Sequence, residues 1–192
     1  MHKLLYVVAC GAPPAAELPA FVSWAQQQGW QVCAVVTPQA SKFVDVPRLA
    51  RLTGYPVRQD YKQPDEPDVL PFPPDAYVVA PATFNTVNKW ASGISDTLAL
   101  GLLNEGLMAG QPIIAVPFPN QALARHPAFQ RSVRFLRECG VQVIFDPPAH
   151  PLPRAHRGSA DSGSADQGAG GPDLFPWAAL RDALAGAVGS RK

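Results

Sequence analysis

The densest group of side chains able to do chemistry lies in the segment Thr83–Lys89 (TFNTVNK), directly behind the apolar run Asp75–Ala80 (DAYVVA). This segment holds two threonines, two asparagines and a lysine, whereas a helix start needs only one capping residue. Its hydroxyls, carboxamides and helix-start amides could hydrogen-bond to a polar ring or an anion. Phe84 and Trp90 in the same stretch are more typical of core or subunit contacts than of ring stacking.

A second candidate is the small-residue turn Gly11-Ala12, which follows the apolar run Lys3–Ala9 (KLLYVVA). A turn of this kind exposes backbone N–H groups to an anion such as a phosphate. Pro13 and Pro14 remove two of those donors, and the chain has no GxGxxG at this point, which argues against an ordinary NAD site. A tight turn without a ligand is the alternative.

Thr37 begins the third candidate loop, Thr37–Val44 (TPQASKFV). Its hydroxyl and the amides that follow could bind a phosphate or a ribityl chain. The alternative is an ordinary helix start, with Thr37 as the N-cap and Pro38 at the first helical position.

Two single residues need weighing as well. His126 precedes Pro127 at a predicted helix start, so a capping or interface role is favoured over that of a proton donor. Cys10 could be a reactive thiol at a helix start. Its place at the end of an apolar strand favours a buried residue instead.

The elements that must position these residues alternate strictly between strand and helix. The predicted strands are Lys3–Ala9, Gln31–Val36, Asp75–Ala80, Gln111–Val116 and Val141–Phe145, and the predicted helices are Ala15–Gln28, Val46–Thr53, Asn85–Met108 with a break near Gly93, and Pro127–Glu138. This alternation predicts a three-layer α/β fold with a parallel sheet. The loops beginning at Cys10, Thr37, Pro81 and Pro117 then share the edge of the sheet where ligands bind.

Composition limits the remaining possibilities. The chain has 192 residues, of which 47% are hydrophobic and 16% charged, with a net charge of +1. This length and composition predict one domain at residues 1–146 and give no electrostatic sign of a nucleic-acid or membrane partner. A Pro/Gly/Ser-rich segment at 147–176 is predicted to be a flexible loop, and 177–192 to be a C-terminal helix and tail.

The three cysteines, Cys10, Cys33 and Cys139, are isolated and form no CxxC or Cys/His cluster. A disulfide framework and a metal site are therefore not expected, and a reducing cytoplasm is the default location. The apolar run before Cys10 imitates a short lipoprotein signal, but a buried first strand explains the same residues. No later segment is long enough to span a bilayer.

Several motifs, in the same order along Lys3–Phe145, resemble those of the flavin-containing cysteine decarboxylase superfamily. This superfamily includes phosphopantothenoylcysteine decarboxylase and the peptidyl-cysteine decarboxylases of lantibiotic biosynthesis. PATFNT and NKWASGISDTL resemble its PASANT and KxAxGIxDNL motifs, and VPFPN stands where the family has PxMN. TPQASKFV, LTGYPV and HPAFQRSVRFLRECGV resemble further family segments.

The resemblance implies an FMN-binding, Rossmann-like (flavodoxin-like) single domain. It also implies a small-molecule substrate and a homo-oligomer, a trimer or a multiple of three, with the flavin near a subunit interface. The implied phosphate and ribityl contacts are Gly11, Ala12 and Thr37, with Phe43 in the segment that follows. Pro81, Ala82, Thr83, Phe84, Asn85 and Thr86 fall on the segment that meets the flavin and substrate, and Asn120 on the asparagine that holds the substrate carboxylate or the intermediate.

Two departures from the family bear on catalysis. The family's acid/base histidine aligns near Pro67, and no histidine exists between His2 and His126. Only Asp65, Glu66 or Asp68 could substitute for it there, and loss of a positioned acid/base typically costs about 10²–10⁴-fold in rate. The segment 147–176 also lacks the cysteine that the coenzyme A enzyme carries in its substrate loop.

The leading hypothesis is an FMN-dependent enzyme acting on a small carboxylate or thiol substrate, related to the decarboxylases but without their histidine. The alternative is an FMN-binding regulatory or scaffold subunit without catalysis. A flavin prenyltransferase-like role is disfavoured, because PATFNT and PFPN resemble the decarboxylase branch more closely.

Overall fold

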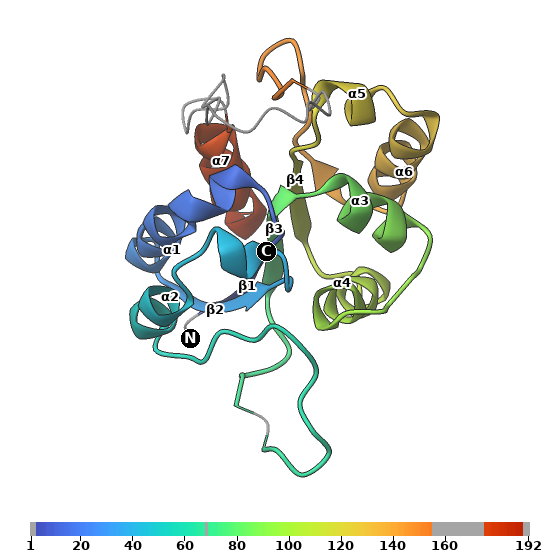
Figure 1. Ribbon diagram of the computed structural model, residues 1–192. Helices are drawn as coiled ribbons and strands as arrows, with labels where there is room; N and C mark the ends of the chain where they lie inside the picture. Colours follow the sequence, from blue (N-terminus) through green and yellow to red (C-terminus); the bar gives the residue numbers. More distant parts are fainter. Residues whose placement is uncertain (1–2, 68, 155–174, 190–192) are drawn as a thin grey trace, which may run out of the picture.

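The computed structural model describes residues 3–67, 69–154 and 175–189 of the chain. Within them lies one all-parallel sheet with the strand order β2-β1-β3-β4-β5 (Figure 1). The strands are β1 (Lys3–Ala9), β2 (Trp30–Val36), β3 (Ala76–Ala82), β4 (Ile113–Pro117) and β5 (Gln142–Val143). This order is that of flavodoxin-like folds, so the predicted three-layer parallel fold is confirmed.

The strands are apolar throughout because helices cover both faces of the sheet. Along β1, the side chains of Leu5 and Val7 enter one core layer, and those of Tyr6 and Val8 enter the other. A strand buried on both faces carries a continuous apolar run rather than an alternating one. The KLLYVVA pattern indicated this burial correctly.

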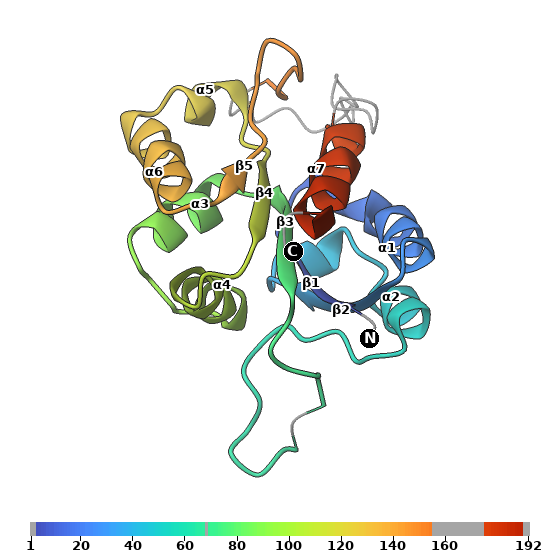
Figure 2. The same cartoon turned by 180° about the vertical axis from the view of Figure 1, so that it is seen from behind.

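The helices divide between the two faces, as the two views show (Figures 1 and 2). One layer contains α1 (Leu18–Gln27), α2 (Val46–Thr53) and α7 (Trp177–Gly189), and the other contains α3 (Phe84–Ala91), α4 (Leu98–Met108) and α6 (Pro127–Glu138). A single-turn helix, α5 (Gln121–Ala124), follows β4. Leu180 and Leu184 of α7 are fully buried, so this C-terminal helix docks on the domain.

Local signals set some boundaries well. Helix α2 begins where Asp45 accepts a hydrogen bond from Arg48 N–H at 2.9 Å and ends at Gly54, whose φ is +75°. A side-chain cap and a left-handed glycine are the usual signals for the two ends of a helix. The predicted range Val46–Thr53 is therefore the observed one.

Other boundaries differ from the prediction. The stretch predicted as one interrupted helix, Asn85–Met108, forms α3 and α4, with Gly93 at a φ of +70° between them. The first helix begins two residues before the predicted Ala15, as a 3-10 helix, η1 (Pro13–Glu17), which leads into α1 at Leu18. A second 3-10 turn, η2, covers Ala40–Lys42. The last strand spans only Gln142–Val143 instead of Val141–Phe145.

The proline-rich segment from Arg58 to Pro74, here called the connector, joins α2 to β3. Tyr6 donates its hydroxyl to the carbonyl of Pro71 at 2.7 Å, and Leu4 N–H donates to the Asp75 carboxylate at 2.7 Å. The end of the connector is therefore fastened beside the start of β1. Most of the predicted flexible loop, residues 155–174, and the tail 190–192 lie outside the described residues.

Candidate functional site

Two loops that the sequence placed at one sheet edge are joined there to strand β3 by backbone hydrogen bonds. Cys10 N–H donates to Pro81 O at 3.0 Å and joins the loop after β1 to β3. Phe118 N–H donates to Ala82 O at 2.8 Å and joins the loop after β4 to the same strand. These contacts lie at the carboxyl ends of β1 and β3, the switch point of this strand order, where such sheets bind ligands.

The loops after β1 and β2 touch at Gly11. A Cβ placed on Gly11 would lie 2.7 Å from Gln39 Cβ and 2.9 Å from the Gln39 carbonyl carbon. Real side chains do not approach backbone so closely, so only glycine permits this contact. Gly11 is partly exposed, while Ala12 beside it is buried. The loop after β1 thus presents backbone rather than side chains.

Thr37 and Phe43 lie on the neighbouring loop after β2. Thr37 N–H donates to Ala9 O at 2.9 Å, which continues the pairing with β1 and leaves the threonine side chain half-buried at the edge. Its carbonyl accepts from Ala40 N–H at 2.8 Å and so begins the 3-10 turn η2. The ring of Phe43, just after this turn, is 39% exposed, a large share for an aromatic side chain.

The start of α3 carries most of the polar groups that the sequence singled out. Thr83 is its N-cap, and its hydroxyl lies 3.4 Å from Thr86 N and 3.0 Å from Thr86 Oγ1. Asn85, in the first turn, is exposed. The first N–H groups of a helix have no intrahelical partner, so this end offers amides and a carboxamide toward the edge of the sheet.

Pro81 and Ala82 lie inside β3 rather than in the loop where they were expected. Both side chains are buried, and both carbonyls accept the inter-loop hydrogen bonds from Cys10 and Phe118. The backbone carbonyls of Pro81 and Ala82 therefore position the neighbouring loops, while their side chains are buried.

Cys10 lies under this helix start. Burial raises the pKa of its thiol, although hydrogen bonds with the Thr86 side chain and the Thr83 backbone act in the opposite direction. A neutral, buried thiol is a poor nucleophile. The buried interpretation of Cys10 is the one that the structure favours.

Phe84 points toward α6. Its ring stacks on Phe129 with centroids 5.8 Å apart, and the His126 ring lies edge-to-face with it at a centroid distance of 5.7 Å. His126 caps α6, because its Nδ1 accepts from Ala128 N–H at 3.1 Å. With Nδ1 as the acceptor, the proton of the neutral imidazole lies on Nε2, so the exposed ring can donate from that atom.

Asn120 stands at the start of α5. Its Oδ1 accepts from Leu123 N–H at 2.9 Å, so the oxygen serves as a cap, while the amide nitrogen is a donor without a protein partner in the described part of the chain. Next to it, the backbone of Gln121 donates to Pro153 O at 2.9 Å and its side chain to Leu152 O at 3.1 Å. The segment after β5 is therefore attached beside Asn120.

Sequence reasoning overlooked His150, which belongs to that segment. Its Nδ1 is buried, with no hydrogen-bond partner among the described residues. An unsatisfied buried nitrogen needs an explanation, and a ligand group is one. The sequence signal that could have identified it is a histidine in the segment that follows the last strand.

Two members of the Thr83–Lys89 group have structural roles instead. Asn88 donates to Phe84 O at 2.9 Å and accepts from Ser132 Oγ at 2.7 Å, which fastens α3 to α6. Lys89 forms an ion pair with Asp96. The polar residues of Thr83–Lys89 therefore form two groups. Thr83, Asn85 and Thr86 lie at the start of α3, at the edge of the sheet, whereas Asn88 and Lys89 bond to neighbouring segments of the fold.

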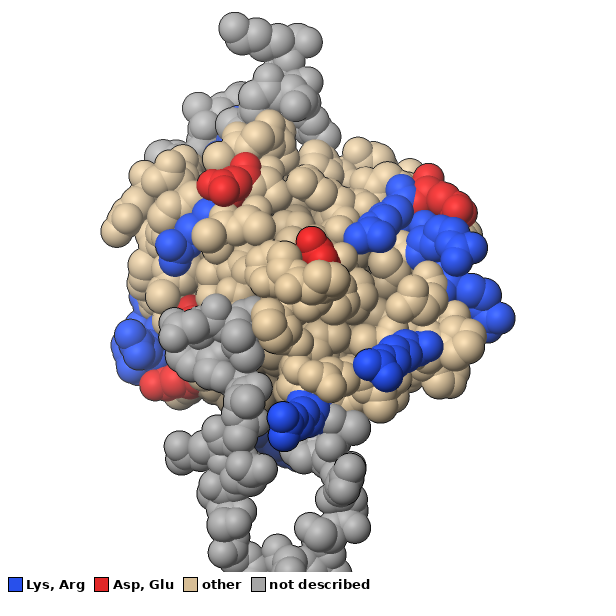
Figure 3. Space-filling view, turned by 90° about the horizontal axis from the view of Figure 1, so that it is seen from above, with Lys and Arg blue, Asp and Glu red and all other residues tan. Residues whose placement is uncertain are grey.

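The described part of the connector contains two of the three carboxylates that could replace the family's histidine, Asp65 and Glu66. Glu66 accepts from Gln63 N–H at 3.1 Å and lies 3.6 Å from Arg58, so its carboxylate is engaged within the connector. Asp65 is exposed, and Asp68 lies outside the described residues. Viewed from above, over the carboxyl edge, the charged side chains are scattered over a mainly uncharged described surface (Figure 3).

Comparison with known proteins matches residues 2–169 with the family described as Flavoprotein. The chain belongs to the Flavoprotein family. This match, together with the decarboxylase relatives below, confirms the resemblance to the flavin-containing cysteine decarboxylase superfamily.

Among its Flavoprotein-family relatives, the cypemycin cysteine dehydrogenase (decarboxylating) of a Streptomyces species is 30% identical over 83% of this chain and 84% of its own. A cysteine/cysteine sulfinic acid decarboxylase from an unknown prokaryotic organism is 35% identical over 50% of this chain, which spans only 27% of that protein. The structure of the FMN-dependent cysteine decarboxylase TvaF, from thioviridamide biosynthesis, superposes with a TM-score of 0.65 at 27% identity, covering 75% of this chain and 90% of that one.

The family match supports a flavin cofactor, and the residues at the edge fit one. The contact at Gly11 has no room for a side chain, and the first-turn amides of α3 suit a phosphate. No group of three or more His, Cys, Asp and Glu among the described residues could hold a metal ion. None of the helices in the described ranges is long and apolar enough to cross a membrane.

Proposed function

We propose that this protein binds FMN at the carboxyl edge of β1 and β3 and is an enzyme for a small carboxylate or thiol substrate. The observation that carries the proposal is the convergence of the Gly11 turn, Thr37 and the start of α3 at one edge. FMN rather than a dinucleotide is supported by the short first loop, in which Pro13 and Pro14 leave few N–H donors.

Each group has a distinct task in this proposal. Gly11 N–H and the first-turn amides of α3 hold the phosphate, and the Thr37 hydroxyl meets the phosphate or the ribityl chain. Asn85 and the Thr83–Thr86 hydroxyl pair face the ring. A bound flavin would supply two-electron oxidation of the substrate.

Asn120 orients the substrate. Its Oδ1 is fixed by Leu123 N–H, which aims the amide nitrogen as a donor, and a carboxylate is a suitable acceptor. The neighbouring backbone is held by the segment after β5, so the donor stands on a supported loop. This arrangement favours decarboxylase-like chemistry on a carboxylate substrate.

A second candidate function is FMN binding without catalysis, in a regulatory or scaffold subunit. It is favoured by the connector, where proline stands at the position of the family histidine and Glu66 is engaged by Arg58. For either function we also propose a homotrimer, or a multiple of three, in the cytoplasm. The isolated thiols of Cys10, Cys33 and Cys139 suit a reducing compartment.

The test begins with the purified protein. Its visible spectrum and the mass of the released cofactor report whether FMN is bound, and a colourless protein that takes up no added FMN would refute both functions. Anaerobic incubation of the FMN-loaded protein with phosphopantothenoylcysteine and with cysteine-ended peptides then separates the two. Release of CO₂ that is lost in Asn120→Ala supports the enzyme, while bound FMN without turnover of any carboxylate or thiol supports the scaffold.

A further inference from the structure

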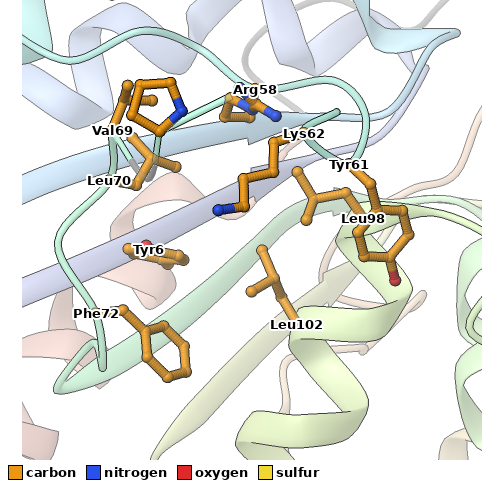
Figure 4. Close-up of a pocket in the computed structure, with 10 residues that line it drawn as sticks. Tyr6, Arg58, Tyr61, Lys62, Val69, Leu70, Phe72, Leu98 and Leu102 are labelled. Carbon is orange, nitrogen blue, oxygen red and sulfur yellow. The ribbon is translucent and has the colours of Figure 1, made fainter. Parts of the chain in front are cut away.

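A cavity of about 500 Å³ lies between the connector, β1 and α4, beside Tyr6 (Figure 4). Its walls are mainly apolar, with Leu102 of α4 on one side and the connector on the other. Lys62 extends across the cavity, but this residue has a partner, and the Arg58 guanidinium lies 3.6 Å from the Glu66 carboxylate. The described cations of this cavity are therefore already engaged.

A smaller cavity, of about 170 Å³, lies between α6 and the chain that leaves β5, and is here called the α6 pocket. Small-molecule pockets typically span roughly 300–1,000 Å³, so the α6 pocket suits only a compact ligand. The described residues that line it are Phe129, Gln130, Val133, Arg134, Arg137 and Phe145. Two of these residues are cationic and none is acidic.

The two arginines of the α6 pocket have no carboxylate partner in the described part of the chain. Arg134 is exposed and forms no ion pair there. Arg137 donates from Nη2 to the Val143 carbonyl at 3.1 Å, a neutral acceptor that does not compensate its charge. The neighbouring carboxylates, Glu138 and Asp146, are exposed and pair with neither arginine. The charge of the α6 pocket therefore complements an anionic group.

Helix α6 and strand β5 together position these cations. Arg134 and Arg137 are three positions apart on α6, so their side chains lie on the same face of the helix. Strand β5 is at the border of the sheet, and Arg137 Nη2 donates to the carbonyls of Val143 and, at 3.5 Å, of Phe145. A guanidinium carries five N–H donors, and these contacts engage only those of Nη2. The donors on Nη1 and Nε of a fixed guanidinium thus remain for a ligand.

The floor of the α6 pocket is aromatic. Phe129 and Phe145 meet edge-to-face, with ring centroids 5.3 Å apart. Phe129 and Val133 are buried and Phe145 is half-buried, so the Phe145 ring offers the larger apolar surface. Gln130 adds no charge, and its amide nitrogen donates to Ala124 O at 2.6 Å. An apolar ring beside the cations favours an anion with a short apolar body over a fully hydrated ion.

The α6 pocket is separate from the flavin edge. In the strand order, β5 is two positions from β3 and three from β1. Neighbouring strands lie about 4.8 Å apart, so β5 is roughly 10 Å from β3 and 14 Å from β1. The Gly11 turn and the start of α3 follow β1 and β3. A ligand in the α6 pocket would therefore occupy a second site.

We infer that the α6 pocket binds a compact monocarboxylate, with its carboxylate at Arg134 and Arg137 and its short apolar or aromatic body against Phe145. Guanidinium groups pair with carboxylates through two parallel hydrogen bonds, which gives this contact both strength and direction. The small volume selects the size of the ligand. The inference does not depend on the identity of the cofactor or on catalysis at the other edge.

The test is an NMR titration of the full chain, at constant ionic strength, with benzoate, benzamide and benzamidine. These probes share one ring and carry a negative, a neutral and a positive group. We expect benzoate to bind at least about tenfold more tightly than benzamidine, with benzamide between them, because a charge-assisted hydrogen bond is replaced by repulsion. Inorganic phosphate, an oxyanion without an apolar body, should bind more weakly than benzoate, and saturation with FMN should leave the benzoate affinity unchanged. Absence of benzoate binding, equal binding of benzamidine, tighter binding of phosphate, or displacement by FMN would overturn the inference.

Matched variants locate the site. Arg134→Met should weaken benzoate about tenfold and leave benzamide unchanged. Arg134→Lys, which keeps the charge but loses the planar fork, should bind benzoate with intermediate affinity. Arg131→Met removes an exposed cation of the same helix that does not line the pocket, and it should change neither affinity. Because Arg134 is exposed, its variants should retain the melting temperature. If Arg134→Met binds benzoate as tightly as the unchanged chain, or if Arg131→Met weakens it equally, the inference fails.

Discussion

Replacing Gly11 with alanine adds one carbon atom where the loops after β1 and β2 touch. The new Cβ would lie 2.7 Å from Gln39 Cβ, 2.9 Å from the Gln39 carbonyl carbon and 3.0 Å from its oxygen. Carbon atoms normally pack about 3.5–4.0 Å apart, so the two loops must separate by roughly 1 Å. Because two of the three close atoms belong to the backbone, a change of rotamer cannot relieve the contact.

Overpacking of this kind costs about 1–3 kcal/mol of folding free energy. In a domain of this size, each kcal/mol lowers the melting temperature by roughly 2–4 °C, so calorimetry should show a decrease of about 2–12 °C. In the proposed FMN site, the displaced Gly11 N–H would also lose its charge-assisted hydrogen bond to the phosphate. Such bonds contribute about 1.5–3 kcal/mol, which corresponds to roughly a 10- to 150-fold weaker FMN affinity.

Two further variants make the comparison specific. Gly186→Ala adds a Cβ that meets no atom within 4 Å, and as an added alanine in α7 it should stabilise the fold by up to about 1 kcal/mol without changing FMN binding. The double variant Gly11→Ala/Gln39→Gly removes only the Cβ–Cβ contact and should recover part of the loss. If Gly11→Ala keeps both its melting temperature and its FMN affinity within twofold, the packing argument and the proposed phosphate turn are both wrong.

The remaining predictions concern three other sites. Asn120→Ala should lower the free energy of unfolding by about 1 kcal/mol, because the side-chain cap of α5 is lost. Asn120→Asp should keep the cap but lose substrate binding, since a carboxylate cannot donate to the substrate. Unchanged turnover in Asn120→Asp would refute the donor role of Asn120. In a thiol-labelling time course of the folded protein at pH 8, half-buried Cys139 should react first and Cys10 only on unfolding, and early labelling of Cys10 would contradict its burial. Burial raises the pKa of Cys33 from 9.0 to about 12, so the folded state retains a proton that the unfolded state releases. Stability should therefore be fully present below pH 9 and decline between pH 9 and 12, and Cys33→Ala should flatten that decline in chemical denaturation.

The sheet and its ligand edge could be predicted because the signals were local. Continuous apolar runs such as KLLYVVA identify strands buried on both faces, and caps such as Asp45 and Gly54 fix a helix to the residue. The loops that meet at the edge follow from the parallel arrangement alone. The predicted ends of the strands were less accurate where the pairing continues through a proline, as at Pro81 of β3 and Pro117 of β4.

What could not be predicted depends on contacts between distant segments. The direction of Phe84 is set by Phe129 and His126, more than 40 positions away in the chain. The packing role of Asn88 depends on Ser132 in the same way. The cavity beside Tyr6 arises from a proline-rich connector whose composition carries no periodic signal, so its course over β1 is visible only in the fold.

The first residues of the connector have one more consequence, for the solubility of the protein. Strand β2 lies at the border of the sheet, and Arg58 pairs with it through hydrogen bonds from Val36 N–H at 2.9 Å and to Ala34 O at 3.2 Å. Unpaired border strands recruit other chains and promote aggregation. The single bridge at Arg58 occupies backbone groups that a foreign strand would need, and the arginine places a positive charge beside them. Arg58 thus protects the edge of the sheet at β2 from pairing with strands of other protein molecules.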